Sequence, residues 1–245
     1  STVLIENVVA FASSHGGGDL AAAIGRLNEL GYWCDLLVVD AKHFVPQSRP
    51  RLFIVGSAVD VDPTSSWQPS QVRPRWISEF VSSFPHLDMR PMAATLPPPS
   101  SKTLGDIVER FDPTDSIWWP DERRKAFSNS LSSLHAERLQ QLVESTGLTW
   151  RTAYRRTRNG KAVWEIRGDD IAGCLRTARG GSSKQAVVEA GNGHMRVRWM
   201  TAAEYARLQG AGPYRIEGVT PAQAMFGFGD AVCVPVVEWL ATEYL

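Results

Sequence analysis

The chain has 245 residues, 43% of them hydrophobic and 21% charged, and its formal net charge is zero, values typical of a soluble globular protein with one large domain or two small ones. The sequence has no charged-then-apolar leader, and no apolar run reaches the roughly 18 residues of a membrane-spanning helix, so we expect no membrane partner. The three cysteines have neither the even number of a disulfide framework nor the spacing of a zinc site, so we expect no metal and a reducing cytoplasm.

The first 56 residues predict a β-α-β-β arrangement. Val3–Phe11 is a mostly apolar, β-branched run that suits a buried strand. Asp19 is placed to cap a helix with apolar residues at helical spacing, which ends at Gly31. Tyr32–Val39 and Arg51–Gly56 predict two further short strands.

The middle of the chain has shorter patterns. Residues 61–120 are rich in Pro, Ser and Trp and predict irregular structure, with short elements near Arg75–Ser82 and Leu104–Phe111. Residues 148–190 predict short strands joined by Gly- and Arg-rich turns. Residues 121–146 predict a helix whose apolar stripe is formed by Leu131, Leu134, Leu139 and Leu142.

The C-terminal part is regular again. It predicts a helix over Ala202–Gln209, a turn-rich stretch around Ala222–Phe228 and a last helix near Val234–Tyr244. The sequence therefore predicts regular α/β structure on both sides of an irregular, basic middle.

Three parts of the chain combine residues that suit catalysis. Glu6-Asn7-Val8 ends the first strand, where α/β folds place reactive groups. Gln47-Ser48-Arg49-Pro50-Arg51 brings two guanidinium groups into one rigid loop. The tail contributes Arg198–Gly210 and Gly229–Val236. Taken singly, the carboxylate is more typical of a structural residue. The arginine loop is as typical of a phosphate-binding or surface loop as of a catalytic one.

Taken together, these motifs resemble the DNA (cytosine-5) methyltransferase family from its Glu-Asn-Val motif to its C-terminus. Gln47, Arg49 and Arg51 match the family's Gln-x-Arg-x-Arg motif. Thr201–Gln209, which includes Arg207, resembles the segment that follows the family's target-recognition region. Gly229–Val236 resembles the final Gly-Asn-x-Val motif, with Asp230 in place of the usual Asn. The four motifs follow one another in the family's order.

The resemblance implies a fold and a division of the chain. We expect an α/β protein: the C-terminal half of a Rossmann-like, S-adenosylmethionine-dependent methyltransferase sheet, plus an irregular target-recognition domain. Residues 1–59 would belong to the catalytic α/β domain, residues 60–195 would form the target-recognition domain that binds duplex DNA, and residues 196–245 would return to the catalytic domain.

The resemblance also implies chemistry. Attack of a thiolate at C6 of cytosine activates C5 for methylation, and charge accumulates at N3 and O2. Glu6 is implied as the proton donor at N3, which desolvation in a closed pocket favours. Arg51 would bind O2, and Arg49 would brace the pocket against Glu6 or a phosphate. Residues expected to hold the motifs structurally are Asn7, Gln47 and Arg207.

Two elements of the family do not occur in this sequence: the glycine-rich strand-turn that holds S-adenosylmethionine, and the Pro-Cys pair that supplies the nucleophile. Gly16-Gly17-Gly18 follows the Glu-Asn-Val strand, which is the wrong position for the cofactor loop. None of the cysteines follows a proline, so we expect all three to be small core residues. The resemblance places Asp230 and Ala231 near the cofactor, whose main site would lie on the missing portion.

Basic residues concentrate where DNA is expected to bind. Residues 151–210 contain 12 Lys and Arg against 5 Asp and Glu, a net charge of +7 that the rest of the chain balances with −7; this asymmetry suggests an anionic partner, with a solvated charged surface as the alternative. Arg can read guanine and Gln adenine, while contact to phosphate alone is the other possibility for each. The candidate DNA-binding residues are Arg155, Arg156, Arg158, Arg176, Arg179, Ser182, Ser183, Lys184 and Gln185.

Three hypotheses remain open. In the first, the chain is one subunit of a split methyltransferase and forms a heterodimer with a complementary chain that carries the two missing elements; an unpaired edge or apolar face is then expected at Val3–Phe11. In the second, it is a catalytically inactive DNA-binding or regulatory module derived from a methyltransferase. In the third, it is a piece of an ordinary single-chain enzyme. We expect a DNA-associated protein in the cytoplasm of a prokaryote or of a phage host.

Overall fold

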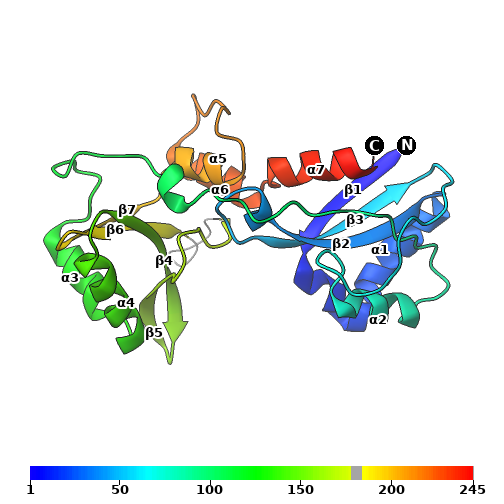
Figure 1. Cartoon of the computed structure of the whole chain (residues 1–245), viewed down its shortest axis with the longest axis horizontal. Coiled ribbons are helices and arrows are strands. Elements are labelled where there is room, and N and C mark those ends of the chain that lie inside the picture. The colour runs from blue at the N-terminus through cyan, green and yellow to red at the C-terminus, as the bar shows by residue number, and fades with distance from the viewer. Residues whose placement is uncertain (178–183, 245) are drawn as a thin grey trace. The chain divides into compact units, whose positions relative to one another are not determined.

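The computed structural model describes residues 1–177 and 184–244. The chain divides into two compact units, each with its own sheet (Figure 1). The first unit comprises Ser1–His43, Arg49–Pro98 and the chain from Val236; the second comprises Phe44–Ser48 and Pro99–Pro235. Residues 60–98, expected in the target-recognition domain, thus pack with the first unit.

The first unit is built on an antiparallel sheet. In the described residues its strands lie in the order β1-β3-β2, with β3 in the centre. The predicted β-α-β-β order is confirmed. Its elements are β1 (Thr2–Val8), η1 (Val9–Gly17), α1 (Gly18–Glu29), β2 (Trp33–Asp40), η2 (Ala41–His43), β3 (Pro50–Ser57) and α2 (Arg75–Ser83).

Helices cover both faces of this sheet, which gives the unit its layered α/β core. Figure 1 shows α1 and α2 on one face and α7 (Val234–Tyr244) on the other. On the α1 side, apolar side chains that recur at helical spacing on α1 pack against alternate residues of the strands. The buried residues of this cluster include Leu20, Ile24, Leu27, Leu36, Leu52 and Ile54.

A buried charge network closes the α7 side of the first unit. The Asp35 carboxylate is fully buried and lies 2.5 Å from Nη2 of Arg73. It also accepts hydrogen bonds from the backbone N–H of Met92 and the hydroxyl of Tyr244, at 2.9 and 2.6 Å. A buried carboxylate must be paired and hydrogen-bonded to be tolerated, so this cluster ties the end of α7 to the sheet.

The start of the chain differs from the prediction at two points. The first strand ends at Val8 and not at Phe11, because Val9–Gly17 forms 3-10 turns. Asp19 is not the helix cap: α1 begins at Gly18, after Gly17 adopts a left-handed conformation (φ 93°) that only glycine accepts readily. Asp19 lies in the first helical turn, where its negative charge interacts favourably with the helix dipole.

The second unit contains an antiparallel sheet with the strand order β5-β4-β6-β7 in its described residues. All seven residues of β6 are buried, so the sheet packs on both faces. The predicted short strands and the helix near Ala202 are confirmed. Its elements are η3 (Leu104–Asp106), α3 (Asp121–Asn129), α4 (Ser133–Glu144), β4 (Thr149–Arg158), β5 (Lys161–Ile166), β6 (Gln185–Gly191), β7 (His194–Trp199), α5 (Ala202–Leu208) and α6 (Pro221–Asp230).

The single helix predicted over residues 121–146 is wrong. Two helices, α3 and α4, are separated by Ser130–Ser132, where serine side chains compete with helical backbone bonds. Leu139 is buried as expected, but Leu134 is 59% exposed, because the break turns the second helix relative to the assumed stripe. Near Leu104–Phe111 the described element is only the short 3-10 turn η3.

The turn-rich stretch predicted around Ala222–Phe228 is a helix. The Thr220 hydroxyl accepts the Gln223 backbone N–H, and the Gln223 side chain accepts the Thr220 N–H, which forms a capping box. Pro221 occupies the first turn, where its missing N–H costs nothing. The cap and the apolar face of the helix outweigh the two glycines that α6 contains.

By length and hydropathy, Pro221–Tyr244 passes a simple test for a membrane-spanning helix, contrary to the sequence analysis. The stretch is not one helix, because Ala231 is extended (ψ 153°) and separates α6 from α7. Met225 and Phe228 of α6 belong to the buried core of the second unit, and Leu240 of α7 is buried too. Its buried apolar side chains therefore serve core packing, whereas Val232 and Val234 are 39% and 36% exposed.

Candidate active site

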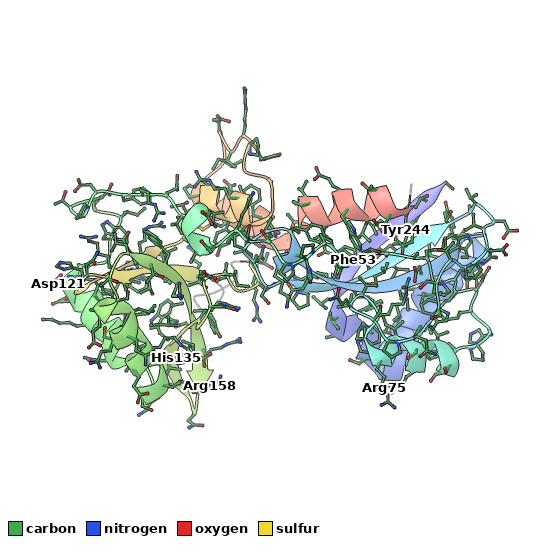
Figure 2. All side chains as sticks on the ribbon, viewed as in Figure 1. Phe53, Arg75, Asp121, His135, Arg158 and Tyr244 are labelled. Carbon is green, nitrogen blue, oxygen red and sulfur yellow. The ribbon has the colours of Figure 1, made fainter. Side chains whose placement is uncertain are left out.

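Glu6, Arg49 and Arg51 lie together where β1 ends and β3 begins. In the antiparallel register, Glu6 is opposite Phe53 and Val8 is opposite Arg51; Figure 2 labels Phe53 within this sheet. Glu6 and Arg51 therefore share one face as diagonal neighbours. Nε of Arg51 lies 3.3 Å from Oε1 of Glu6, and Nε of Arg49 lies 3.8 Å from the same oxygen.

The cluster is largely withdrawn from water. The side chains of Arg49, Glu6 and Arg51 are 3%, 14% and 16% exposed. Burial raises the pKa of Glu6 above its usual value, and the attraction of Arg49 and Arg51 offsets only part of that effect. A carboxyl group in this state keeps its proton to higher pH than an exposed glutamate, as a hydrogen-bond donor to a substrate requires.

The loop that carries Arg49 is fixed to the sheet by its backbone. The N–H of Arg49 donates to Oδ1 of Asp40 at 2.7 Å, and the carbonyl of Arg49 accepts the N–H of Ala41 at 3.2 Å. Asn7, next to Glu6, accepts the backbone N–H of Val8 at 2.8 Å through its side-chain oxygen. These contacts hold the backbone on both sides of the charged cluster.

The strand that carries Glu6 is at the edge of its sheet. β1 pairs with β3, and in the described residues its other edge has no partner strand. Leu4, Ile5 and Val8 are 38%, 37% and 49% exposed. An open edge lined with apolar side chains is normally covered in a functional protein. The edge expected for the split-enzyme hypothesis is therefore present.

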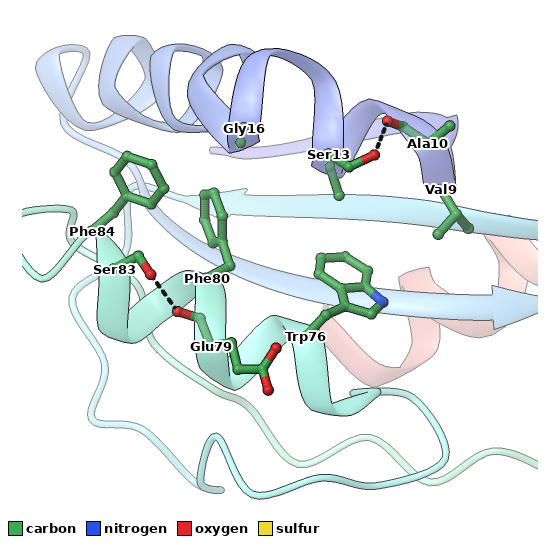
Figure 3. Close-up of a pocket in the computed structure, with 11 residues that line it drawn as sticks. Val9, Ala10, Ser13, Gly16, Trp76, Glu79, Phe80, Ser83 and Phe84 are labelled. Carbon is green, nitrogen blue, oxygen red and sulfur yellow. Dashed lines mark hydrogen bonds between the residues drawn. The ribbon is translucent and has the colours of Figure 1, made fainter.

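A pocket of about 480 Å³ lies elsewhere in the first unit, between η1 and α2. Figure 3 shows the rings of Trp76 and Phe80, from α2, and of Phe84, which follows this helix, facing η1. Neither Glu6 nor the two arginines line this pocket. It is therefore separate from the charged cluster.

Gln47, predicted to hold its motif structurally, is fully buried in the second unit. Its Nε2 donates to the carbonyl of Leu208 at 2.8 Å, and its Oε1 accepts the N–H of Leu175 at 3.0 Å. The backbone of the same loop bonds to Ala172, through Ser48. One side chain thus satisfies two backbone groups from distant segments, as buried polar groups require.

An ion pair that was not predicted from the sequence joins β7 to α5 in the second unit. Arg198 and Glu204 are fully buried and form a two-pronged pair, with Nη1 of Arg198 2.9 Å from Oε2 of Glu204. Glu204 also completes a capping box with Thr201. The Thr-x-x-Glu spacing was the sequence signal that could have identified this pair. Arg207, predicted as structural, donates to the carbonyl of Ile107 at 2.7 Å.

The final motif packs tightly against another segment of the second unit. A Cβ atom added at Gly229 would lie 2.6 Å from the carbonyl carbon and oxygen of Arg176. Oδ1 of Asp230 accepts a hydrogen bond from the Thr177 hydroxyl at 2.9 Å. Gln209, which the sequence analysis did not single out as a site residue, donates from its buried Nε2 to the carbonyl of Ala231 at 3.1 Å.

The residues present do not by themselves fit a whole S-adenosylmethionine. A pocket of about 450 Å³ beside Ala231 is walled mainly by apolar side chains, among them Tyr214, Phe228 and Val232. None of its described lining residues carries a charge that could pair with an amino or carboxylate group. The Asp230 carboxylate is directed to Thr177.

The three arginines at the end of β4 lie on opposite faces of the sheet. Arg156 and Arg158 share one face with Glu165, which lies 3.9 and 2.8 Å from them. Figure 2 shows Arg158 near the tip of the β4–β5 hairpin. Arg155 faces the other way. Burial lowers the pKa of Arg123 on α3, and the charge of Arg155 lowers it further. In the described part of the chain, no carboxylate lies within ion-pair distance of Arg155 or Arg123.

Arg123 lies over a group of tryptophans. Its guanidinium carbon is 4.1 Å from the ring centre of Trp119 and 5.0 Å from that of Trp199. Trp164, opposite Arg155 in the register, packs on both indoles with ring centres 5.4 and 5.6 Å away. The tryptophans form core packing on one side and a cation-binding surface on the other.

The basic stretch, residues 176–185, is described by the structure only at its two ends. Arg176 is exposed and Lys184 is half-buried. Arg179, Ser182 and Ser183 lie outside the described residues. The structure corrects the expectation for Gln185.

Gln185 is 4% exposed, and both ends of its amide bond to the backbone of Gly173, at 3.1 and 2.8 Å. Its side chain is engaged in holding the segment, so it is withdrawn from the candidate DNA-contacting set.

The cysteines occupy packing positions. Cys34 and Cys233 are buried and Cys174 is half-buried. Burial raises the pKa of Cys34 to about 12, so its thiol stays protonated and unreactive near neutral pH. Residues 1–177 and 184–244 contain no cluster of His, Cys, Asp and Glu that could hold a metal ion.

Comparison with known proteins gives a consistent family. A model of C-5 cytosine-specific DNA methylases matches residues 1–245. The type II methyltransferase M.AgeI of Thalassovita gelatinovora is 46% identical over 72 residues, which are 28% of this chain and 16% of that protein. The orphan methyltransferase M.SPBetaI of Bacillus phage SPbeta is 29% identical over 116 residues, which are 44% of this chain and 25% of that protein.

Solved structures show the same fold at low sequence identity. The methyltransferase EhMeth of Entamoeba histolytica matches 99% of this chain with a TM-score of 0.52 and 13% identity, over 61% of its own length. The Dnmt2 methyltransferase of S. pombe matches 98% with a TM-score of 0.53 and 16% identity, over 65% of its own length. The α/β methyltransferase fold predicted from the sequence is confirmed, and the chain spans less than two thirds of each of these relatives.

Proposed function

This chain belongs to the family of C-5 cytosine-specific DNA methylases, and on that premise we propose that it supplies the target-base pocket and the DNA-recognition surface of a DNA (cytosine-5) methyltransferase. The cysteine nucleophile and the main S-adenosylmethionine site would lie on a complementary chain. The active species would be a heterodimer that forms in the cytoplasm of a prokaryote or phage host.

The observation that carries the proposal is the largely buried cluster of Glu6, Arg49 and Arg51. Glu6 has a raised pKa beside two guanidinium groups, a combination that a purely structural ion pair does not need. A pocket for the N3–O2 edge of cytosine needs a protonated acid and a cation side by side. Glu6 and Arg51 meet this requirement.

Each residue has a distinct task in this proposal. A thiolate of the complementary chain adds to C6 of the base, and electron density moves to the N3–O2 edge. Glu6 donates its proton to N3, and Arg51 stabilises the charge on O2. Arg49, which is almost fully buried, holds the Glu6 carboxyl group in place. The target base must leave the DNA helix to reach this position.

The open edge of β1 is the proposed place for the complementary chain. A strand paired there would extend the sheet next to Glu6 and cover Leu4, Ile5 and Val8. It would carry the Pro-Cys loop close to the Glu6 cluster, and the cofactor site beside it.

For the DNA-recognition surface, we propose that Arg155 and Arg123 contact the phosphate backbone of DNA. Neither is neutralised by a carboxylate in the described residues, whereas Arg156 and Arg158 share Glu165. Arg155 is close enough to disfavour the charge on Arg123, and an anion that contacts both groups, such as a DNA phosphate, would offset this repulsion. Arg176 and Lys184 are available for base or phosphate contact at the ends of the basic stretch.

The test is transfer of labelled methyl groups from S-adenosylmethionine to duplex DNA. It uses this chain alone, a polypeptide with the glycine-rich and Pro-Cys loops alone, and both together. We expect activity only in the mixture, lost in Glu6→Ala and kept in Glu79→Ala, which changes an exposed glutamate of α2.

Activity that appears only when the two loops precede Ser1 in one polypeptide would support the same pocket in a single-chain enzyme. Duplex binding without methyl transfer in any combination would instead favour the inactive DNA-binding or regulatory module.

A further inference from the structure

The residues that hold the two ends of the basic stretch come from distant parts of the second unit. At its start, the N–H of Leu175 donates to Gln47, and Leu175 itself is 1% exposed. At its end, the Gln185 side chain bonds to both backbone groups of Gly173. Both ends are thus held by buried contacts in the second unit, while the side chains of Arg176 and Lys184 remain accessible.

The last turn of α6 contributes the closest of these contacts. Gly229 is buried against the backbone of Arg176–Thr177, and a Cβ at this position would come within 2.6 to 2.7 Å of it. Real Cβ atoms do not approach backbone this closely, and backbone cannot move aside as the end of a flexible side chain can. The glycine is therefore required for this packing.

The next residue adds a polar contact. The Thr177 hydroxyl donates to Oδ1 of Asp230 at 2.9 Å. The turn that presents Asp230 is itself held by Gln209, whose Nε2 donates to the carbonyls of Phe228 and Ala231 at 2.6 and 3.1 Å. Asp230 thus faces the start of the basic stretch from a fixed position.

We propose that Gly229 and Asp230 are positioning residues for DNA recognition: they clamp Arg176–Thr177 and so set where the basic stretch begins, and the Asp230 carboxylate serves this clamp instead of the cofactor. The inference rests on the proposed DNA recognition by this stretch. Side chains that read DNA must be presented in a fixed geometry, which the supporting residues provide. An acceptor at position 230 is sufficient for the clamp, so Asn would serve there as well as Asp.

The helix offers a matched control. Gly227 lies in the same helix but is exposed, and nothing lies within 4 Å of a Cβ added there. Gly229→Ala and Gly227→Ala therefore make the same chemical change with a similar gain in helix propensity. Only the first displaces Arg176–Thr177.

The experiment measures binding of the full chain to a labelled 30-base-pair duplex across a salt series, together with the thermal midpoint of each variant. We expect Gly229→Ala to weaken binding about tenfold and to reduce the slope of log Kd against log salt by about one, because a phosphate contact is lost. Gly227→Ala should match the wild type. Thr177→Val should weaken binding about two- to tenfold, the range for one lost hydrogen bond, while Thr177→Ser and Asp230→Asn retain affinity.

Equal affinity and equal salt slope for Gly229→Ala and Gly227→Ala would overturn the proposal. If Gly229→Ala does not fold, the half-buried Thr177 decides: wild-type binding by Thr177→Val overturns the clamp. In the complemented enzyme, Asp230→Ala should raise KM for DNA and leave KM for S-adenosylmethionine unchanged; the reverse result assigns Asp230 to the cofactor. Absence of duplex binding by the wild-type chain would overturn the proposed function itself, and the clamp with it.

Discussion

Arg51 and Glu6 are diagonal neighbours on one face of the β1–β3 ladder, with 3.3 Å between Nε of Arg51 and Oε1 of Glu6. The register of two strands fixes this distance, so it does not depend on the order of a loop. In the proposed base pocket, Glu6 and Arg51 would therefore be in place before substrate arrives, which would lower the cost of reaching the reactive geometry.

Glu6→Gln should lower the rate of methyl transfer in the complemented enzyme by about 10²–10⁴-fold, the usual worth of a positioned general acid. The wild-type rate should fall as pH rises through the raised pKa of Glu6, because the proton is lost. Residual transfer by the Gln variant should lack that limb, since an amide does not titrate. A pH–rate profile of both proteins tests this, and an unchanged high-pH limb in the variant would contradict it.

The same pKa shift has a consequence for stability. Because the pKa of Glu6 is higher in the folded chain than in the unfolded one, the native state binds this proton more tightly. The stability that Glu6 contributes is therefore full below the unfolded pKa and is lost as pH rises through the folded pKa. Urea unfolding across this window should show a smaller pH dependence for Glu6→Gln than for the wild type.

Leu4→Lys should impair assembly with the complementary polypeptide. Leu4 is 38% exposed on the open edge strand, so covering its exposed part contributes about 1 kcal/mol, which alone corresponds to roughly a fivefold rise in Kd when it is lost. The lysine charge placed in an apolar contact adds to this loss. Leu134→Lys, at an exposed leucine of the second unit, is the control and should assemble normally. Sedimentation or titration calorimetry measures both. Equal loss in the two variants would point to a general effect of the added charge.

Arg155→Gln should weaken duplex binding by about three- to tenfold and lower the salt slope by about one, as expected for a lost phosphate contact. Arg158→Gln should have a smaller effect, because Glu165 lies 2.8 Å from Arg158 and already balances its charge. Fluorescence anisotropy over a salt series distinguishes them. A larger loss for Arg158→Gln would place DNA on the opposite face of the sheet.

Glu204→Gln should destabilise the fold by about 3–5 kcal/mol, because it leaves the Arg198 guanidinium buried without its counter-charge. Glu79→Gln, in an exposed helical pair with Arg75, should change stability by less than about 0.5 kcal/mol. The free energy of unfolding from urea denaturation gives both values. A small effect at Glu204 would show that water reaches Arg198 in the variant.

The parts of the fold that sequence predicts best are those with one dominant local signal. The strands that flank the arginine loop are short apolar runs, and they form within one residue of the predicted bounds. The motif match also brought Glu6 and Arg51 to attention, although their contact depends on strand register, which periodicity alone does not give.

Other features depend on tertiary contacts. Gln185 sits in a basic, Gly-rich stretch typical of DNA contact, yet Gly173 captures its amide. Turns were predicted around Ala222–Phe228, whereas this stretch lies in helix α6, whose Gly229 allows the close approach of Arg176. Leu134 fits a helical stripe only if the helix continues through Ser130–Ser132, and it does not. In each case a partner distant in sequence decides the outcome.

The open edge of β1 also bears on how the chain behaves in a cell. An unpaired strand with Leu4, Ile5 and Val8 exposed is a template for pairing with another copy of itself as readily as with a different chain. Protein left without cover at this edge should form insoluble aggregates, so production of the chain would have to be matched to that of whatever covers it. Co-expression with the chain that covers this edge should therefore keep the protein soluble, so solubility identifies that chain.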